Sequence, residues 1–351
     1  MSRVTIQTAD GSYDAIIGRN LLEKSGELVR QIFHSGRCAI ISDSNTGPLF
    51  GRIVYDSLQR AGFASELITI AAGEDAKSMA QVGGLCDQLG TAGLDRSSFL
   101  VSLGGGVVGD LAGFVAAIYL RGIPYVSVPT TLLAQVDSSI GGKTGVNSAA
   151  GKNLIGSFHH PSLVIADTDV LRTLPERIWH EGFAEVIKHG IIRDAELFQT
   201  AAQLDLQSLV ERNVAIKAAI VHADEREQAG ERSLLNFGHT IGHAIEHAAG
   251  YGRLLHGEAI SLGIVAAARI SVRRAGLSLG ECEQIIGALQ THHLPTSLSP
   301  DFPRERIFAA LARDKKFENG QVRFVVVHQI GRASVTENVT LDDLRAAVAE
   351  L

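Results

Sequence analysis

Short apolar runs alternate with amphipathic segments through the first half of the chain, and this alternation limits the possible folds more than any other feature. The runs end in polar or glycine residues and lie at 37–45, 64–71, 98–106 and 125–131. Residues 49–62 and 78–93, between the runs, have helical spacing. Strands separated by helices form βαβ units with a parallel sheet. Ligands of such sheets bind at the carboxyl ends of the strands, so the residues there are the first candidates for a site.

The pattern changes at about Leu171. Helical periodicity dominates from there, and a hairpin-like stretch follows at residues 320–335. A chain of 351 residues is long enough for two domains with separate cores. We therefore predict an α/β domain over residues 1–170 and a mainly α-helical domain over residues 171–351.

The composition argues against several classes of protein. No apolar run reaches the roughly 18 residues of a membrane span, and residues 1–18 contain no apolar signal core. The net charge of −6 argues against a nucleic-acid partner, which would need a basic surface. Three widely spaced cysteines are typical of a reducing compartment. We expect a cytoplasmic protein, and an anionic small substrate remains compatible with a locally cationic pocket.

A glycine-rich turn, "GGGVVGD", directly follows one predicted strand. It places Gly104, Gly106 and Gly109 in the order G-x-G-x-x-G. Glycines let a phosphate approach the backbone, and the next helix offers unpaired N–H groups to it. The alternative is a tight strand–helix turn that binds no ligand. It stays open because the next strand ends without the acidic residue that usually binds the ribose of a dinucleotide. Four residues after earlier strands could hold a ribose instead: Asp43, Asn45, Glu74 and Lys77.

Residues 136–158 form a long connection that is rich in glycine and polar residues. We expect a functional loop, because structureless connections of this length are uncommon otherwise. Lys143, Lys152 and Asn153 lie among glycines and small residues rather than beside other charges. The alternative is a solvated surface loop.

A predicted helix at residues 181–190 places Glu181, Glu185 and Lys188 on one face. An isolated Glu–Lys pair of this kind is more often a solvent-facing ion pair than part of a site. The helix is therefore a candidate only if other polar groups join it.

The stretch "LNFGHTIGHAIEH" has histidines at a spacing of four: His239, His243 and His247. Residues four apart on a helix project from one face, so two imidazoles can reach one metal ion. A single buried histidine usually only finds a hydrogen bond. Three in register, followed by His256, favour a metal site, which a distant acid such as Glu185 could complete. The spacing does not decide which histidines are ligands.

Together these motifs resemble 3-dehydroquinate synthase, of the sugar phosphate cyclase superfamily. The resemblance covers nearly the whole chain and rests on "GGGVVGDLAGFVAAIYLRGI", "VPTTLLAQVDSSIGGKTGVN", "GKNLIGSF", "GFAEVIKHGII", "DERE", "LLNFGHTIGHAIE", "LHGEAI" and "DKK". It implies a Rossmann-like NAD-binding domain, a helical metal- and substrate-binding domain and a cleft between them. It also implies NAD, a divalent metal (zinc or cobalt) and a homodimer.

The resemblance also implies roles for individual residues. The implied metal ligands are Glu185, His239 and His256. The implied NAD-binding residues are Asp43, Asn45, Glu74, Lys77, Gly105, Gly106, Val107, Val108, Gly109, Asp110, Thr130, Thr131, Lys143, Lys152, Thr173 and Leu174. The implied substrate contacts are Asp137, Lys143, Lys152, Asn153, Lys188, Lys217, Arg232, Asn236 and one or both of Lys315 and Lys316. His243 is implied to transfer a proton, and Arg121 to reach a phosphate across the dimer interface. His247 has no implied role, and we expect it to be structural.

The implied substrate, 3-deoxy-D-arabino-heptulosonate 7-phosphate, explains the many cationic residues, because it has a carboxylate and a nearly dianionic phosphate. The implied reaction is transient oxidation by NAD, elimination of phosphate, reduction and intramolecular aldol closure to 3-dehydroquinate. The alternatives are a cyclase acting on another phosphosugar, a metal-dependent alcohol or glycerol dehydrogenase, and a non-catalytic binding protein. The "RDKKF" stretch argues against the first and the phosphate-directed lysines against the second. A dehydrogenase would accumulate NADH, whereas a cyclase would not.

Overall fold

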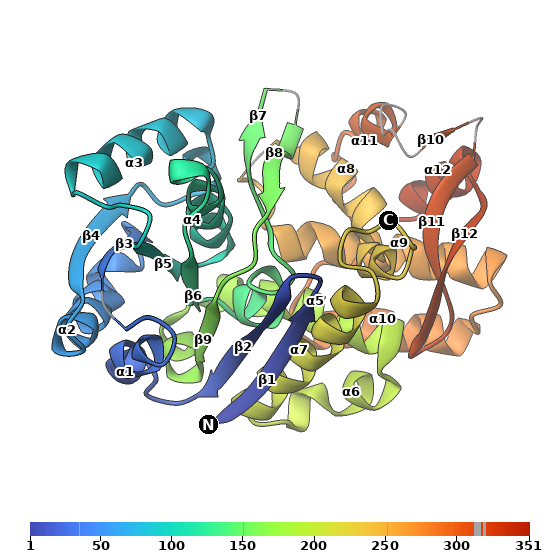
Figure 1. Ribbon diagram of the computed structural model, residues 1–351. Coiled ribbons are helices and arrows are strands. Elements are labelled where there is room, and N and C mark those ends of the chain that lie inside the picture. The colour runs from blue at the N-terminus through green and yellow to red at the C-terminus, as the bar shows by residue number, and fades with distance from the viewer. Residues whose placement is uncertain (35, 150, 251, 312–316, 319–320) are drawn as a thin grey trace. The chain divides into compact units, whose positions relative to one another are not determined.

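The computed structural model describes residues 1–34, 36–149, 151–250, 252–311, 317–318 and 321–351 (Figure 1). The chain forms two compact units. The first consists of residues 1–174 and 205–218, and the second of residues 175–204 and 219–351. Helix α7 (Leu206–Ala223) therefore begins in the first unit and ends in the second.

The first unit is built on a mostly parallel sheet. Among the described residues, seven strands form it in the order β1-β2-β9-β6-β5-β3-β4. In chain order the strands are β1 (Ser2–Thr8), β2 (Gly11–Gly18), β3 (Arg37–Asp43), β4 (Ala64–Ile70), β5 (Phe99–Gly104), β6 (Tyr125–Pro129) and β9 (Leu163–Asp167). Only the β1–β2 pair is antiparallel. The predicted α/β fold is confirmed.

Helices cover both faces of the middle of this sheet, which is why β3, β5, β6 and β9 are almost continuously buried apolar runs. Ala39 and Ile41 pack into a core with α3 (Met79–Thr91) and α4 (Gly106–Ile118). Cys38 and Ile40 point to the other face and are also fully buried. On that side Figure 1 shows α1 (Ser25–Arg30) and α2 (Arg52–Arg60).

The order of the strands reverses direction between β3 and β5. From β3 the chain moves outward to β4, whereas from β5 it moves the opposite way to β6. Such a reversal leaves a crevice at the carboxyl ends of the two strands, where α/β proteins bind ligands. Asp43 ends β3 and Gly104 ends β5, so the glycine-rich turn lies at this position.

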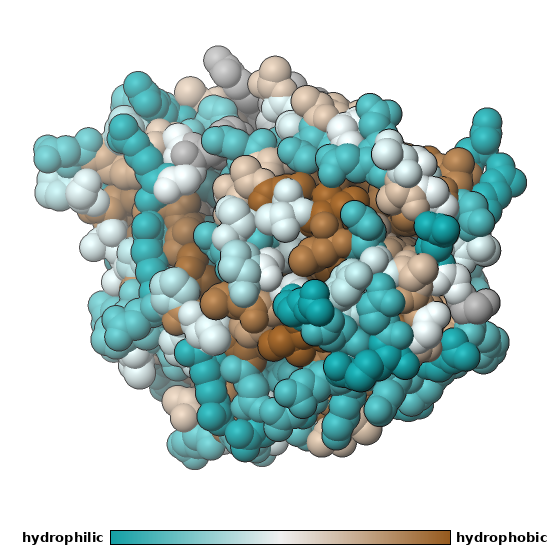
Figure 2. Space-filling model, turned by 90° about the vertical axis from the view of Figure 1, so that its left-hand side faces the viewer, coloured by the Kyte–Doolittle hydropathy of each residue, from teal (hydrophilic) through white to brown (hydrophobic). Residues whose placement is uncertain are grey.

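Strand β4 forms one edge of the sheet and is only partly covered. Leu67 on β4 is 37% exposed, Leu49 in the short helix η2 (Gly47–Gly51) is 54% exposed, and Ile53 at the start of α2 (Arg52–Arg60) is 38% exposed. Figure 2 shows apolar patches on one face of the molecule, separated by hydrophilic side chains. An interrupted apolar surface of this kind is ordinary for a protein exterior.

The predicted functional loop at residues 136–158 is mostly a β-hairpin, so the loop expectation was wrong. Strands β7 (Lys143–Ser148) and β8 (Gly151–Phe158) are antiparallel and pair Gly145 with Gly156. A Cβ at Gly156 would lie 2.2 Å from the Thr144 carbonyl oxygen. Glycine is therefore required by the close approach of two strands, and the sequence does not distinguish this cause from loop flexibility.

The second unit is mainly helical and is organised around α9 (His256–Arg274), whose residues are mostly buried. The other helices are α5 (Glu176–Arg193), α6 (Ala195–Thr200), α8 (His239–Ala249), α10 (Leu279–Thr291), α11 (Arg304–Leu311) and α12 (Leu341–Ala349). Strands β10 (Phe317–Glu318), β11 (Gln321–Gln329) and β12 (Arg332–Thr340) form an antiparallel sheet. The predicted helical part with a hairpin near its end is confirmed.

Glycines bring α8 and α9 into close contact. A Cβ at Gly263 would lie 2.0 Å from the Gly238 carbonyl oxygen, and one at Gly242 would lie 3.0 Å from the Ala259 carbonyl oxygen. Gly257, at the start of α9, approaches the Glu181 carbonyl of α5 in the same way. Side chains at the first residues of α8 and α9 therefore lie near α5. No helix in the part of the chain that the structure describes is long and apolar enough to cross a membrane.

Asp224 organises the turn that joins α7 to the short helix η8 (Arg232–Asn236). Its two carboxylate oxygens accept hydrogen bonds from the backbone N–H groups of Gln228, Ala229, Gly230 and Arg232. Burial acts to raise the pKa of Asp224, but these N–H groups outweigh it and lower the pKa. A folded-state pKa below the unfolded value means that the carboxylate stabilises the fold above the unfolded pKa of about 4.

We predict that Asp224→Asn destabilises the second unit by about 1.5–3 kcal/mol at pH 7, the usual contribution of hydrogen bonds to a charged group. The difference from the wild type should shrink as the pH falls below about 4, because protonation removes the same charge from the wild-type side chain. Denaturant unfolding at several pH values measures both effects. The matched control is the exposed Asp301→Asn, and equal stability of the two variants at pH 7 would contradict the role of Asp224.

Candidate functional site

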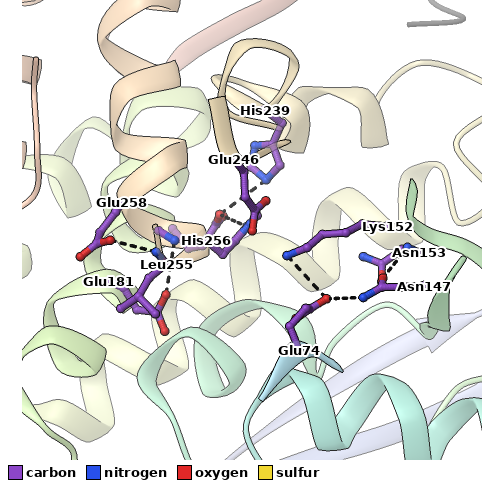
Figure 3. Close-up of polar contacts among 12 residues, drawn as sticks. Glu74, Asn147, Lys152, Asn153, Glu181, His239, Glu246, Leu255, His256 and Glu258 are labelled. Atoms are coloured by element: carbon purple, nitrogen blue, oxygen red, sulfur yellow. Dashed lines mark hydrogen bonds and ion pairs between the residues drawn. The ribbon is translucent and has the colours of Figure 1, made fainter. Parts of the chain in front are cut away.

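Three helices of the second unit bring one carboxylate and two imidazoles together. Glu185 lies in the middle of α5 and is fully buried, His239 is the first residue of α8, and His256 is the first residue of α9. One ligand atom from each lies within 4.8 Å of the other two. Figure 3 shows His239 and His256 on neighbouring elements of this cluster.

The distances suit a single small cation. The Nε2 atoms of His239 and His256 each lie 3.6 Å from Oε1 of Glu185. Zinc binds such ligands at about 2.0–2.2 Å in a tetrahedral arrangement, which places ligand atoms roughly 3.5 Å apart. The set of two imidazoles and one carboxylate, with a fourth position left over, is typical of catalytic zinc and is also suited to cobalt.

The buried Glu185 is also paired with Lys188, one turn further along α5. Both side chains are almost fully buried, so the interpretation of a solvent-facing ion pair is wrong. Burial, followed by the charge of Lys188, holds the pKa of His239 well below its usual range. Burial would also lower the pKa of His256, but Glu185 and Glu246 outweigh it and raise the pKa to about 10. A cation bound here would displace the His256 proton.

Two acids next to the cluster had been given no role in it from the sequence, although Glu181 had been placed on the same helix face as Glu185. Glu246 is buried on α8, and its Oε2 lies 3.8 Å from Nδ1 of His256. Glu181 accepts a hydrogen bond from the Gly257 N–H at 3.4 Å, and burial raises its pKa to about 7. The position of Glu246 three residues after His243 was a usable signal, because it places both on one face of the helix.

The structure distinguishes the histidines of α8. The ring centroid of His243 lies 5.2 Å from that of His239 and 5.9 Å from that of His256. His243, Glu246 and His256 form a second group of possible ligands that shares His256 with the first. His247 is exposed and belongs to no such group among the described residues.

Two other predicted contacts lie on η8. Arg232 is buried, and its guanidinium donates a hydrogen bond to the Glu225 carbonyl. Asn236 donates to Oε1 of Glu227 at 2.7 Å. Glu227 has a positive φ of 58° and had not been singled out from the sequence. The turn held by Asp224 therefore also positions these polar side chains.

In the first unit, the Lys77 ammonium contacts several of the predicted site residues. The Lys77 side chain is 4% exposed. Its Nζ donates to Oδ2 of Asp110 at 2.7 Å and to Oδ1 of Asn153 at 2.5 Å, and it lies 3.9 Å from Oε1 of Glu74. Burial raises the pKa of Asp110, although the adjacent ammonium of Lys77 opposes the shift.

Glu74 connects this group to the hairpin. Its Oε1 accepts a hydrogen bond from Nδ2 of Asn147 at 2.8 Å and lies 3.5 Å from Nζ of Lys152 (Figure 3). Lys152 and Asn153 therefore lie beside the turn after β4, as the prediction of a functional segment requires. Asn147 had not been singled out, because a lone amide in a polar segment gives no distinguishing signal.

The glycine-rich turn leads directly from β5 into the N-terminus of α4, whose N-cap is Gly105. A Cβ at Gly104 would lie 2.6 Å from Val108, and one at Gly106 would lie 3.3 Å from Ser138. Gly106 does not have positive φ, so a preference for glycine there comes from the close approach of the Ser138 side chain. The open N–H groups of α4 remain suited to a pyrophosphate.

The remaining predicted residues have varied surroundings. Oδ1 of Asp43 accepts the N–H groups of Asn45 and Thr46. Nζ of Lys217 lies 2.8 Å from Oδ1 of Asp137. Thr173 and Leu174 end the short helix η6 (Thr168–Thr173), and Thr130 and Thr131 follow β6. Lys143 is exposed, and Arg121 is exposed with a positive φ of 71°. Lys315 and Lys316 lie outside the described residues.

Comparison with known proteins is unambiguous. Residues 67–181 match the family described as 3-dehydroquinate synthase N-terminal, and residues 182–317 match 3-dehydroquinate synthase C-terminal. The 3-dehydroquinate synthase of Symbiobacterium thermophilum is 44% identical over 97% of this chain and 98% of its own length.

Two of the solved structures that are similar to this protein each cover 99% of the chain. A 2-deoxy-scyllo-inosose synthase complexed with carbaglucose-6-phosphate, NAD+ and Co2+ is 26% identical, with a TM-score of 0.87 over 100% of its length. The 2-epi-5-epi-valiolone synthase of Streptomyces hygroscopicus subsp. jinggangensis, with NAD+ and Zn2+ bound, is 30% identical, with a TM-score of 0.88 over 99% of its length. The chain matches both the N-terminal and the C-terminal family description, and its identity to the curated relative is well above 30% over nearly the whole chain. This protein therefore belongs to the 3-dehydroquinate synthase family.

Proposed function

We infer that the protein is a 3-dehydroquinate synthase, a phosphate-eliminating lyase that converts 3-deoxy-D-arabino-heptulosonate 7-phosphate to 3-dehydroquinate and phosphate. The main support is the 40–44% identity to curated enzymes of this name over nearly the full chain. The Glu185–His239–His256 cluster agrees with the metal that this reaction uses in the family.

The residues present fit both implied cofactors. The two solved neighbours contain NAD+ with either Co2+ or Zn2+. For the metal, the fit rests on a fully buried carboxylate facing two imidazole Nε2 atoms. For NAD, it rests on the glycine turn before α4 at the reversal of the sheet, with Glu74 and Lys77 after β4, two strands away in the sheet. When bound, NAD supplies reversible hydride transfer, and the metal supplies positive charge beside a substrate hydroxyl.

We propose that Glu185, His239 and His256 hold the metal and that Lys188 keeps this region cationic. The ammonium of Lys188 offsets the charge of Glu185, so a divalent cation would leave a net positive site suited to an anionic substrate. His243 is exposed and close to the cluster, which suits an imidazole that exchanges a proton with substrate. Arg232 and Lys217, with Lys143 and Lys152, are the proposed cations for the carboxylate and phosphate.

The alternatives differ in substrate or in cofactor balance. The two solved neighbours make other cyclic products, but at 26% and 30% they are less similar than the curated synthases. Of the proposed partners, a phosphosugar has the most support, because one neighbour binds carbaglucose-6-phosphate. Homodimeric assembly, with Arg121 directed to the partner, stays a prediction, as does the cytoplasmic location.

The activity is tested by phosphate release from the heptulosonate 7-phosphate. We expect release to require both NAD and a divalent metal, with no accumulation of NADH during many turnovers, because the hydride returns to the substrate. Absorbance at the NADH maximum and a phosphate assay follow the two quantities in one reaction. Stoichiometric NADH would instead indicate a dehydrogenase, and absence of phosphate release would exclude the proposed reaction.

The metal assignment predicts different behaviour for two histidines of α8. Loss of a residue that only hydrogen-bonds to a metal ligand weakens metal binding by ~10–100-fold. His239→Ala removes a ligand itself, so it should weaken Zn2+ binding by more than this. His247→Ala is the matched control, because His247 lies on the same helix and is exposed. Elemental analysis after dialysis against a weak chelator measures the retained metal. One tightly bound metal per chain in His239→Ala would exclude this ligand set.

Lys152 is predicted to contact a bound anion, with its ammonium 3.5 Å from Glu74 in the structure. A charge-assisted contact contributes roughly 1.5–3 kcal/mol, so Lys152→Ala should lower kcat/KM by about 10–100-fold. The exposed Lys24→Ala is the control for loss of one positive charge. Steady-state kinetics, with folding checked by thermal melting, compares the two. Wild-type efficiency in a folded Lys152→Ala would place Lys152 outside the site.

A further inference from the structure

Asn147 lies where the regular pairing of the β7–β8 hairpin is interrupted. Val146 pairs with Ile155, and Ser148 pairs with Gly151. Asn147 is the one residue between the two pairs on β7, whereas residues 152–154 lie between them on β8. Such irregularities are common next to functional sites, where they redirect side chains. Here the irregularity contains both Lys152 and Asn153.

The backbone and the side chain of Asn147 bond to different segments. Its backbone N–H donates to the Lys77 carbonyl at 2.9 Å, so this group serves the turn after β4 and not the hairpin. Its Nδ2 donates to Oε1 of Glu74 at 2.8 Å. Its Oδ1 accepts the Asn153 backbone N–H at 2.9 Å. Oδ1 of the amide thus accepts the Asn153 N–H in place of a backbone hydrogen bond between the two strands. Nδ2 of the same amide orients the Glu74 carboxylate.

These contacts close a ring of four residues. Asn147 links Glu74 to Asn153, the Asn153 side chain accepts from Nζ of Lys77, and Nζ of Lys77 lies 3.9 Å from Glu74. Asn153 has a φ of 53°, a left-handed conformation that asparagine tolerates better than most residues. The Asn147 amide therefore holds both the orientation of Glu74 and the backbone that presents Lys152 and Asn153.

We propose that Asn147 is a positioning residue for the NAD site, fixing the Glu74 carboxylate for the cofactor. The inference rests on the proposed function, in which Glu74 and Lys77 contact NAD. Without the amide, the polar partners that Oε1 of Glu74 keeps within the described part of the chain are two ammonium groups, Lys152 at 3.5 Å and Lys77 at 3.9 Å. The carboxylate would turn toward them, and NAD would then have to break an ion pair in order to bind.

Two variants separate the contacts of Asn147. Asn147→Asp keeps an oxygen for the Asn153 N–H but replaces the donor to Glu74 with a second negative charge. Asn147→Ala removes both side-chain bonds. We expect each variant to raise the Kd for NAD by about tenfold or more, the effect of losing a hydrogen bond to a charged group. Calorimetric titration of the metal-loaded protein with NAD measures the Kd, and thermal melting reports folding.

The matched control is Ser157→Ala on the same hairpin, outside the ring, which should leave the Kd for NAD unchanged. A double-mutant comparison then tests the route of the effect. In a Glu74→Gln background, Asn147→Ala should change the Kd by less than about threefold, because positioning acts through the Glu74 carboxylate. A purely structural role would lower the melting temperature equally in both backgrounds and would not depend on Glu74.

Each outcome is decisive. Wild-type NAD affinity in a folded Asn147→Asp overturns the positioning role, even where Asn147→Ala fails to fold. An equal effect of Asn147→Ala with and without the Glu74 carboxylate overturns it as well. A wild-type chain that binds no NAD would overturn the proposed function itself, so the two failures are distinguishable in one set of titrations.

Discussion

A fully buried carboxylate is the constraint on which the second unit depends. Transferring the Glu185 charge into the interior is costly unless partners compensate for it, and the helices around α5 supply them. Lys188 lies one turn away on α5, while His239 and His256 come from the starts of α8 and α9. The ammonium compensates the carboxylate, and the two imidazoles together with Glu185 form a group that could hold a metal ion. The packing of three helices is thus arranged around a charge.

Close helix contacts make this arrangement possible. Gly263 and Gly242 allow α8 and α9 to approach until backbone atoms touch, and Gly257 does the same for α9 against α5. The histidines are then placed by helix starts and not by long flexible connections. A helix N-terminus disfavours a protonated imidazole, which agrees with the lowered pKa of His239. Neutral imidazole is the form that binds metal, so the helix position favours metal binding at His239, whereas His256, whose pKa Glu185 and Glu246 raise to about 10, must lose its proton first.

The helices and strands of both units can be predicted well from the sequence. The contacts between residues that are distant in the sequence cannot. Apolar runs and helical spacing depend on neighbouring residues, so the parallel sheet and α8 could be predicted from them. The four-residue spacing of His239, His243 and His247 indicates a shared helix face. However, of the two imidazoles beside Glu185, one is His239 and the other is His256, which lies on another helix. Only the family resemblance selected His256, because contacts between helices leave no local pattern. Glu246 was given no role although its spacing from His243 was a usable signal, and Asn147 was missed because a lone amide in a polar segment gives none.

The hairpin at residues 143–158 shows why glycine content alone misleads. Gly145 and Gly156 face each other across a ladder with no space for a Cβ, so these glycines make the segment more regular and not more mobile. A hairpin holds side chains more accurately than a loop, and its one irregularity is where Lys152 and Asn153 lie. The regular strand pairing on either side fixes where that irregularity lies. The Asn147 amide fixes the orientation of the Glu74 carboxylate and of the backbone at Asn153. Lys152, which we propose to contact an anion, already lies 3.5 Å from Oε1 of Glu74, so a rigid hairpin limits how much closer the two charges can come.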